Sequence, residues 1–469
     1  MRIFAVGIFC VLLFACQQEQ PKETYFGGGI IHPKHDFVFL LQDNNIIDSI
    51  KIDNNGHFEY RFKLDKPEIF TFRHEFEYQT LYLEPQDSVR LRLNTLDFDE
   101  SLVFAGEGAS ENNFLIESYL LNQKNSDLIL SYYKISPKDF EFKTDSIKKS
   151  REEKLMSLRE KHNLSDIFLN IAQKSIDYEF YDMRERYAFL LNKYDHKKSK
   201  TISDNFFSYR NQINFNDKTT NSLFGYQRFL DNYLKNQSIK ICEQKNLSVD
   251  CYNLNTYTNI DDRIRLVDSL INDKHLRNRF FERFIQEEII YAKTPQHLEH
   301  THELIERFDF SPDEEKRLKA LVNFQSAMIV NADLKHVKIK CKNFENHELK
   351  DVMKKNMAVV YSWSIQSPSH HKLRIKKIKE LKQKYPDIQF VGINIDHNFP
   401  DRWLDAVSNY NANFENEFMI VAEENAPFYR NYLNKVFFLN KDCIVKKSEI
   451  ILSNQDFDKH IEDFLAAQN

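Results

Sequence analysis

The chain has 469 residues, of which 42% are hydrophobic and 29% charged, and its formal net charge is only -5. This composition is globular, and so small a net charge excludes a general preference for nucleic acid or for anionic membrane surfaces. At roughly 100–200 residues per domain, the length predicts about three units. None of the six cysteines forms a C-x-x-C pair or has zinc-finger spacing with histidine, so we expect no metal and no cofactor.

The N-terminus has the pattern of an export signal. Met1-Arg2 gives one positive charge, and an apolar run from Ile3 to Ala15 follows, too short for a stop-transfer helix. The run ends in Ala15-Cys16 and then turns polar, which resembles a bacterial lipobox. The resemblance implies a signal peptide and lipobox at residues 1–16, a lipid anchor on Cys16 that tethers the chain to a membrane, and a place in the cell envelope. The alternative is a plain signal peptide with a chance cysteine.

After a tether at residues 17–23, residues 24–110 predict a small antiparallel β-domain. Side chains alternate with a period near two in five runs, at 37–41, 47–52, 58–62, 70–72 and 89–93. Asn54-Asn55-Gly56 predicts a hairpin turn between two of them. The segments 53–58, 83–89 and 104–114 resemble the N-terminal β-domain, of unknown function, found in Bacteroidota lipoproteins that carry a C-terminal thioredoxin-like domain.

Residues 111–326 show helical periodicity. Thr294-Pro295 and Ser311-Pro312 predict helix starts, with Glu314 placed to complete a capping box after Ser311. His297, His300 and Glu303 follow one another at steps of three residues, so neighbouring members can approach each other on a helix. A metal site is one interpretation, but a solvated helix face is the better one.

From residue 333 to residue 469 strands and helices alternate, which predicts a mixed α/β sheet. We expect strands at 357–363 and 390–396, a helix at 368–385, a hairpin of 435–439 with 444–445, and a last helix at 456–465. The fold class is therefore multidomain α+β. It comprises the β-domain, a helical middle and this C-terminal α/β domain.

The last domain resembles TlpA-like thiol–disulfide oxidoreductases. The resemblance rests on the apolar strand ending in Trp363, on the loop and helix start after it, on the strand 390–396, on Trp403 and on the hairpin 432–445. It implies a thioredoxin-like fold. It places the redox motif on Ser367-Pro368-Ser369-His370, the cis-proline on Asn434 and the hairpin glycine on Cys443.

Each of these positions departs from the family pattern. Thiol–disulfide exchange needs one thiolate to attack and a second thiol to resolve the mixed disulfide, and both motif cysteines are absent. A cis peptide is essentially a proline phenomenon, and Asn434 is not proline. We therefore expect no redox activity. Ser367 and His370 could form a nucleophile–base pair, but a capping serine with exposed histidines is the better interpretation.

The helix after the motif is unusually basic, with Leu373, Ile378 and Leu381 as its expected core stripe. The basic side chains either form a solvated face or bind an acidic partner or lipid headgroups. Among the other cysteines, Cys242 could pair with Cys251, and Cys341 with Cys443. A single reactive Cys443, exposed at a turn tip, is a further hypothesis.

Three hypotheses for function follow. The first is a tethered, non-catalytic lipoprotein that binds a protein or peptide partner through its thioredoxin-like fold. The second is an envelope thiol–disulfide oxidoreductase or antioxidant reductase that uses a non-standard cysteine. The third is an accessory protein of a cell-surface nutrient-uptake system.

Overall fold

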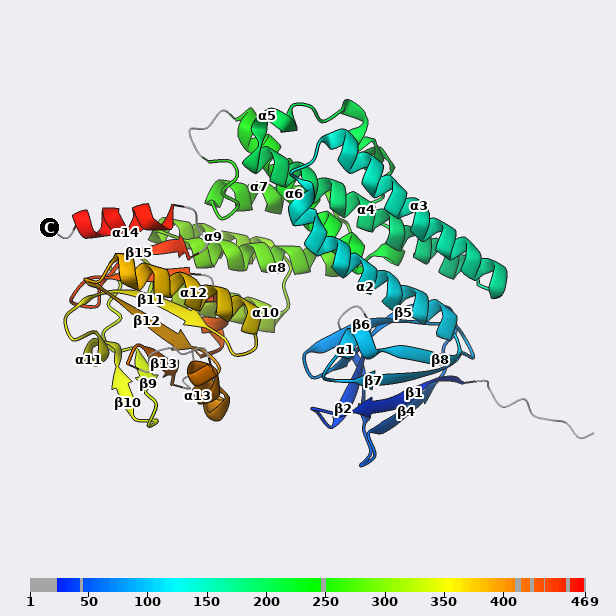
Figure 1. Ribbon diagram of the computed structural model, residues 1–469, viewed down its shortest axis with the longest axis horizontal. Helices are drawn as coiled ribbons and strands as arrows, with labels where there is room; N and C mark the ends of the chain where they lie inside the picture. Colours follow the sequence, from blue (N-terminus) through cyan, green and yellow to red (C-terminus); the bar gives the residue numbers. More distant parts are fainter. Residues whose placement is uncertain are drawn as a thin grey trace, which may run out of the picture. The chain divides into compact units, whose positions relative to one another are not determined.

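The structure is a computed structural model that describes residues 23–42, 45–245, 250–409, 415–421, 426–433, 435–452 and 456–467 (Figure 1). The chain forms two compact units, Met1–Asn236 and Gln237–Asn469. Cys16 and almost all of the tether at 17–23 lie outside the described residues. Within the described part of the chain, no helix has the length and apolar character needed to cross a bilayer.

The first unit begins with two four-stranded sheets. One has the order β4-β1-β7-β8 and the other the order β3-β2-β5-β6. The strands are β1 (Thr24–Ile31), β2 (Phe37–Gln42), β3 (Asn45–Lys51), β4 (His57–Phe62), β5 (Glu68–His74), β6 (Glu77–Leu83), β7 (Ser88–Asn94) and β8 (Val103–Glu107), with the short helix α1 (Phe98–Ser101) before β8. Phe26, Leu40, Phe72 and Leu91 belong to one buried cluster that joins the two sheets.

β1, β6 and β8 were not among the five predicted strands, and two further features of this β-region differ from the sequence prediction. β1 pairs with β7 in parallel, so the region is not wholly antiparallel. Gly28 makes this pairing possible, because a Cβ at that position would lie 2.0 Å from the Leu91 carbonyl oxygen. The turn after Asp53 does form, with Gly56 at φ 81°, but it is not a hairpin turn. It leads from β3 in one sheet to β4 in the other.

Helices make up the rest of the first unit. They are α2 (Ala109–Tyr132), α3 (Pro137–Lys161), α4 (Asp166–Tyr194), α5 (His196–Ser199), the 3-10 helices η1 (Asp204–Gln212) and η2 (Lys218–Thr220), and α6 (Phe224–Gln244), in which the boundary between the units falls. Buried carboxylates on α4 are paired rather than isolated. Glu185 accepts hydrogen bonds from Tyr209 Oη at 2.7 Å and from Arg210 Nε at 2.8 Å.

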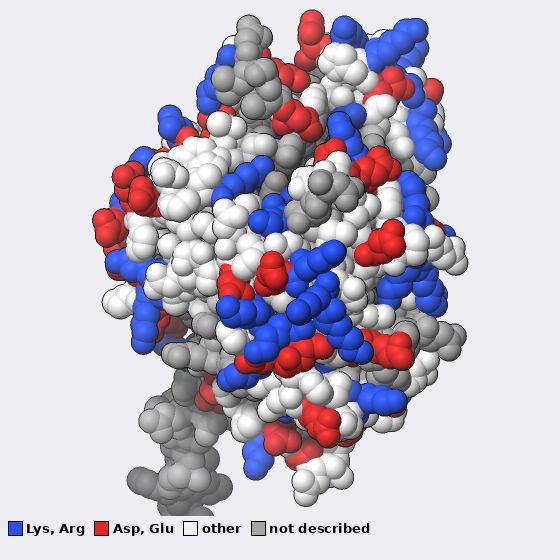
Figure 2. Space-filling view, turned by 90° about the vertical axis from the view of Figure 1, so that its left-hand side faces the viewer, with Lys and Arg blue, Asp and Glu red and all other residues white. Residues whose placement is uncertain are grey.

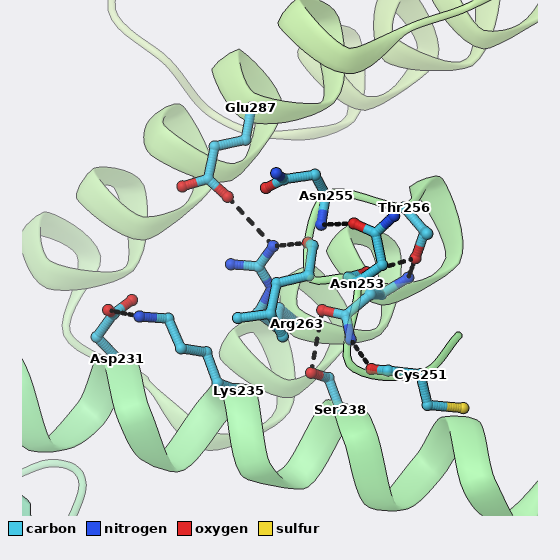
Figure 3. Close-up of polar contacts among 11 residues, drawn as sticks. Asp231, Lys235, Ser238, Cys251, Asn253, Asn255, Thr256, Arg263 and Glu287 are labelled. Carbon is cyan, nitrogen blue, oxygen red and sulfur yellow. Dashed lines mark hydrogen bonds and ion pairs between the residues drawn. The ribbon is translucent and has the colours of Figure 1, made fainter. Parts of the chain in front are cut away.

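The second unit begins with four more helices, α7 (Tyr257–Leu270), α8 (Lys274–Tyr291), α9 (Pro295–Arg307) and α10 (Pro312–Ser326). The predicted caps are confirmed: the Thr294 hydroxyl accepts a hydrogen bond from the His297 N–H, and Ser311 forms a capping box with Glu314. Buried Arg263 on α7 donates to the Leu254 carbonyl at 2.7 Å and pairs with Glu287 on α8 at 3.2 Å (Figure 3). This arginine therefore joins α7 to α8 and to the loop before α7.

A seven-stranded mixed sheet completes the second unit, in the order β10-β9-β13-β12-β11-β14-β15. Its strands are β9 (Lys338–Lys340), β10 (Asn346–Glu348), β11 (Met357–Trp363), β12 (Ile388–Asn394), β13 (Glu417–Ile420), β14 (Lys435–Leu439) and β15 (Val445–Ile451). The helices are α11 (Leu349–Met353), α12 (Pro368–Lys384), α13 (Pro400–Asn409), the 3-10 helix η3 (Ala426–Tyr432) and α14 (Phe457–Ala466). The predicted strands, hairpin and helices are all present, and β9, β10 and β13 are additional.

Candidate functional site

The candidate site is the loop between β11 and α12, where the resemblance of the sequence predicts a vestigial redox motif. β11 is almost entirely buried, and α12 begins at Pro368, which suits a first helical turn because proline lacks the N–H that would be unpaired there. Ser367 occupies the N-cap position, but its side chain makes no capping hydrogen bond, so the predicted role of a capping serine is wrong. The side chains of Pro368, Ser369 and His370, and all of Asn434, lie outside the described residues.

Asp396 holds this loop in one conformation. Its buried carboxylate, just after β12, accepts hydrogen bonds from the Ser364 hydroxyl at 2.8 Å and from the Ile365 N–H at 2.6 Å. The other carboxylate oxygen pairs with Arg430 Nη2 of η3 at 3.2 Å. Arg430 also donates to the Gln366 amide oxygen at 2.7 Å. Three consecutive loop residues are thus fixed by one ion pair.

Arg374 fixes the helix behind the loop. Its buried guanidinium donates to the Ser362 carbonyl at the end of β11 and to the Leu433 carbonyl at 2.5 Å. Burial lowers the pKa of Arg374 to about 10, so the guanidinium stays charged at neutral pH. The arginine therefore joins α12 to β11 and to the segment that precedes β14.

The basic face of α12 is smaller than the sequence suggests. Leu373 is 69% exposed, whereas Arg374 and Ile375 are buried, so Leu373 does not belong to the core stripe, although Ile378 and Leu381 do. Lys384 pairs with Asp458 of α14 at 3.0 Å, and Lys377 approaches the same carboxylate at 3.8 Å. Figure 2 shows a face of the molecule on which basic side chains gather beside a band of acidic ones.

Glu417 is a buried acid behind β11. Its carboxylate accepts hydrogen bonds from Tyr361 Oη at 2.5 Å and from Trp363 Nε1 at 2.9 Å. Gly392 leaves the necessary room, since a Cβ there would lie 2.2 Å from Glu417 Oε2. Burial raises the pKa of Glu417 to about 7. Because both oxygens are occupied by side chains of β11, this acid positions the strand that leads into the loop.

The structure shows which of the four cysteines after the signal segment are paired and which are free. Cys242 and Cys251 form a disulfide, and Cys341 and Cys443 are free thiols. Cys443 lies in the left-handed region at φ 63°, a conformation that glycine adopts more readily than other residues. It is buried against Met353, with 3.5 Å between Sγ and Sδ, so the expectation of an exposed thiol is wrong. Burial also raises the pKa of the Cys443 thiol, which disfavours the reactive thiolate.

An apolar cavity of about 40 Å³ lies next to β11. Its lining includes Phe324 of α10, Met328 just after that helix, Val360 of β11, Tyr432 and Phe437. Ligand pockets usually enclose about 300–1,000 Å³, so this cavity is too small for an organic substrate. This cavity therefore does not provide a substrate pocket for the candidate site.

Comparison with known proteins gives a likeness of fold only. No family model matches the chain, and no curated protein does. Among solved structures, the chain is similar to the thioredoxin domain of a thiol–disulfide oxidoreductase from Bacteroides vulgatus (11% identity, 29% of this chain and 96% of that chain, TM-score 0.25). It is also similar to a SCO1/SenC family lipoprotein from Bacillus anthracis, with 15% identity over 30% of this chain and 96% of that chain and a TM-score of 0.25. A third similar structure is a thiol–disulfide oxidoreductase from Bacteroides fragilis, with 12% identity over 28% of this chain and 98% of that chain and a TM-score of 0.23.

At these TM-scores the likenesses carry no argument about activity. The strand order is separate evidence for the type of fold. β11 and β12 are parallel and joined through α12, and β14 and β15 follow as an antiparallel pair on the other side of β11. With α14 closing the chain, this is a thioredoxin-like domain. Fold alone does not give function.

The sequence did not reveal the residues that fix the loop. Asp396 ends a predicted strand, and this was its only signal. Arg430 and Arg374 act on segments 34 and 59 residues away, respectively, and no local pattern marks such contacts.

Proposed function

We propose that this chain is an exported, membrane-tethered lipoprotein whose thioredoxin-like domain performs no thiol–disulfide exchange and acts as a binding or accessory protein. The observation that carries the proposal is the loop after β11. It has Ser367 and His370 where redox relatives have cysteines, and it is fixed by Asp396 and Arg430. A rigid loop without sulfur is suited to recognition, because little conformational entropy is lost when a partner binds.

The chemistry around the loop favours a protein or peptide partner. Gln366 and Arg430 are exposed, and their amide and guanidinium groups can donate further hydrogen bonds to an extended peptide. Leu373 adds an exposed apolar side chain on the first turns of α12. Polar donors beside one aliphatic side chain suit a peptide better than a nucleic acid.

Site-specific photo-crosslinking in intact cells tests this binding role. A photoreactive residue replaces Leu373, and in a matched control it replaces Phe142 of α3, which is 77% exposed. We expect a discrete adduct from position 373 that Arg430→Ala weakens, and none from position 142. Equal adducts at both positions, or no adduct at 373, would refute a partner at this loop.

The tether rests on Cys16 and the apolar run before it. Incorporation of a labelled fatty acid and fractionation of cells measure it directly. We expect label and membrane association in the natural chain and loss of both in Cys16→Ser. Cys10→Ser is the matched control and should change neither. A membrane-free natural chain would contradict the lipid anchor.

The alternative is an envelope reductase that uses a non-standard cysteine. Cys443 is a poor candidate because its thiol is buried and its pKa is raised, whereas Cys341 is partly exposed. An insulin-disulfide reduction assay separates the two functions. The proposal expects no turnover by the natural chain. Turnover that disappears in Cys341→Ser would establish the reductase instead.

A further inference from the structure

Three side chains of different chemistry meet at the hairpin formed by β9 and β10, at one edge of the seven-stranded sheet (Figure 1). The Cys341 thiol, a carboxylate oxygen of Glu345 and a ring nitrogen of His347 all lie within 4.8 Å of one another. Within the described residues, no other set of three cysteine, histidine or acidic side chains brings its donor atoms so close together. Thiolate, imidazole and carboxylate are the groups that bind zinc in proteins.

The pairing of the two strands explains why these side chains converge. His347 of β10 pairs with Ile339 of β9, and the hydrogen bond from the Cys341 N–H to the Glu345 carbonyl at 3.2 Å extends the pairing towards the turn. Cys341 and Glu345 thus lie opposite each other, and His347 lies two residues after Glu345. Opposed residues share one face of a sheet, and so do residues two apart on one strand. All three side chains therefore belong to one face of the hairpin.

A tight turn holds the backbones of Cys341 and Glu345 together. The Phe344 N–H donates to the Cys341 carbonyl at 2.8 Å, and Phe344 has a left-handed φ of 63°. The Asn343 amide oxygen accepts hydrogen bonds from the Glu345 N–H at 3.3 Å and from the Cys341 thiol at 2.5 Å. Because the turn fixes these positions in advance, little backbone entropy is lost when a ligand binds to their side chains.

The spacing of the donor atoms is close to that of a single coordinated ion. His347 Nε2 lies 3.9 Å from Glu345 Oε2, which is too long for a hydrogen bond. A tetrahedral zinc ion with ligands at about 2.0–2.3 Å separates its donor atoms by roughly 3.3–3.6 Å. The Glu345 and His347 side chains are 68% and 37% exposed, so both have room for the small rotation that remains.

The next carboxylate along β10 belongs to a separate pair. Glu348 follows His347 and therefore lies on the other face of the hairpin. Its carboxylate contacts His336 Nδ1 at 3.1 Å and Lys350 Nζ at 2.5 Å. His336 and Glu348 thus offer an imidazole and a carboxylate without a thiol, and they provide a matched control for the proposed site.

The histidines of α9 do not form a comparable site. His297, His300 and Glu303 do not bring three donor atoms together within the described part of the chain. His297 stacks on Tyr257 with 5.1 Å between ring centroids, and its Nδ1 accepts a hydrogen bond from the Lys293 N–H at 3.3 Å. The metal interpretation of that run is therefore not supported, and His300→Gln serves as a distant control.

We propose that Cys341, Glu345 and His347 bind a divalent transition-metal cation of the zinc class. Cys341 binds through its thiolate, so the thiol proton is released to solvent as the sulfur–metal bond forms. His347 binds as the neutral imidazole and Glu345 as the carboxylate, and a fourth position is left for water. The sulfur donor favours zinc over magnesium and calcium, which prefer oxygen ligands. This site goes beyond the binding role of the β11–α12 loop and does not depend on it.

The proposal departs from the sequence expectation of no metal. That expectation rested on the absence of zinc-finger spacing between cysteine and histidine, and Cys341 and His347 do not have it. β9 and β10 were not among the predicted strands, so the position of Cys341 opposite Glu345 could not be read from the sequence.

Calorimetric titration of the chelator-treated full chain with Zn²⁺ tests the site. We expect the natural chain to bind, and Cys341→Ser and His347→Gln each to lower the affinity by at least about tenfold, the lower limit for changes in the outer shell of a metal site. Glu345→Gln should also weaken binding, because it removes an anionic ligand. His336→Gln, beside the same hairpin, and His300→Gln should bind normally.

Co²⁺ in place of Zn²⁺ identifies the sulfur ligand. A thiolate-to-cobalt charge-transfer band should appear in the natural chain and in His336→Gln and be absent from Cys341→Ser. Zn²⁺ should also slow the reaction of Cys341 with a maleimide probe. Circular dichroism checks that each variant is folded.

Three outcomes would overturn the proposal. They are no Zn²⁺ binding by the natural chain, full affinity in both Cys341→Ser and His347→Gln, or a loss of affinity in His336→Gln as large as that in His347→Gln.

Discussion

Arg430 Nη2 lies 3.2 Å from Asp396 Oδ1, although the two residues are 34 positions apart in the sequence. The pair connects η3 to the end of β12, and its carboxylate holds Ser364 and Ile365 of the loop between β11 and α12. The loop between β11 and α12 is thereby fixed by charge-assisted hydrogen bonds.

The two members of this pair should not contribute equally to stability. Asp396 is buried and serves several donors, so Asp396→Ala should lower the free energy of unfolding by about 1.5–3 kcal/mol, the range for hydrogen bonds to charged groups. Arg430 is half exposed, so Arg430→Gln should lower the free energy of unfolding by only about 0–1 kcal/mol. Urea unfolding followed by tryptophan fluorescence measures both. A larger loss of unfolding free energy for Arg430→Gln than for Asp396→Ala would contradict the assignment of Asp396 as the main residue that holds the loop.

Glu417 should make stability fall as the pH rises towards neutrality. Burial raises its pKa from 4.5 to about 7, so the folded state binds this proton more tightly than the unfolded state does. The contribution is complete below the ordinary pKa and is lost as the pH rises through about 7, by up to about 1.4 kcal/mol per pH unit. The difference in urea midpoint between the natural chain and Glu417→Gln should change in this window. A difference that is constant with pH would contradict the raised pKa.

The disulfide should contribute measurably to the stability of the second unit. Cys242 and Cys251 are separated by nine positions, and closing so short a loop is worth about 2–3 kcal/mol in the chain-entropy description. The double variant Cys242→Ser/Cys251→Ser should unfold at a correspondingly lower urea concentration. Cys341→Ser is the control. Mass spectrometry after alkylation of the unreduced chain should leave both disulfide cysteines unlabelled, and their labelling would disprove the bond.

The two free thiols should differ in reactivity. Under native conditions a maleimide probe should label Cys341, which is partly exposed, and spare Cys443, which is buried with a raised pKa. In urea both should be labelled. Rapid native labelling of Cys443 would restore it as a candidate redox residue.

Local signals in the sequence predicted much of the fold. Proline and capping residues identified the starts of α9 and α10, and buried apolar runs identified β11 and β12. β1 was not predicted because three consecutive glycines interrupt its alternation. Of these glycines, Gly28 is the one that lies against Leu91 of β7. Period and capping are properties of a few neighbouring residues, whereas strand pairing depends on distant ones.

The candidate sites were harder to predict for the same reason. That residues 367 and 370 are Ser and His and not cysteine could be read directly, because residue identity is a local property of the sequence. The side chains that fix the loop, Asp396 and Arg430, meet only after the sheet and η3 have formed.

Restoring the dithiol tests the central claim most directly. The chain carrying both Ser367→Cys and His370→Cys would place a thiol at the start of α12, where a helix N-terminus stabilises a thiolate. In an insulin-disulfide reduction assay, we predict that the natural chain is inactive and that the double variant gains activity. Activity in the natural chain, or an inactive double variant that is folded and has both thiols accessible, would contradict a thioredoxin-like domain that has lost only its chemistry.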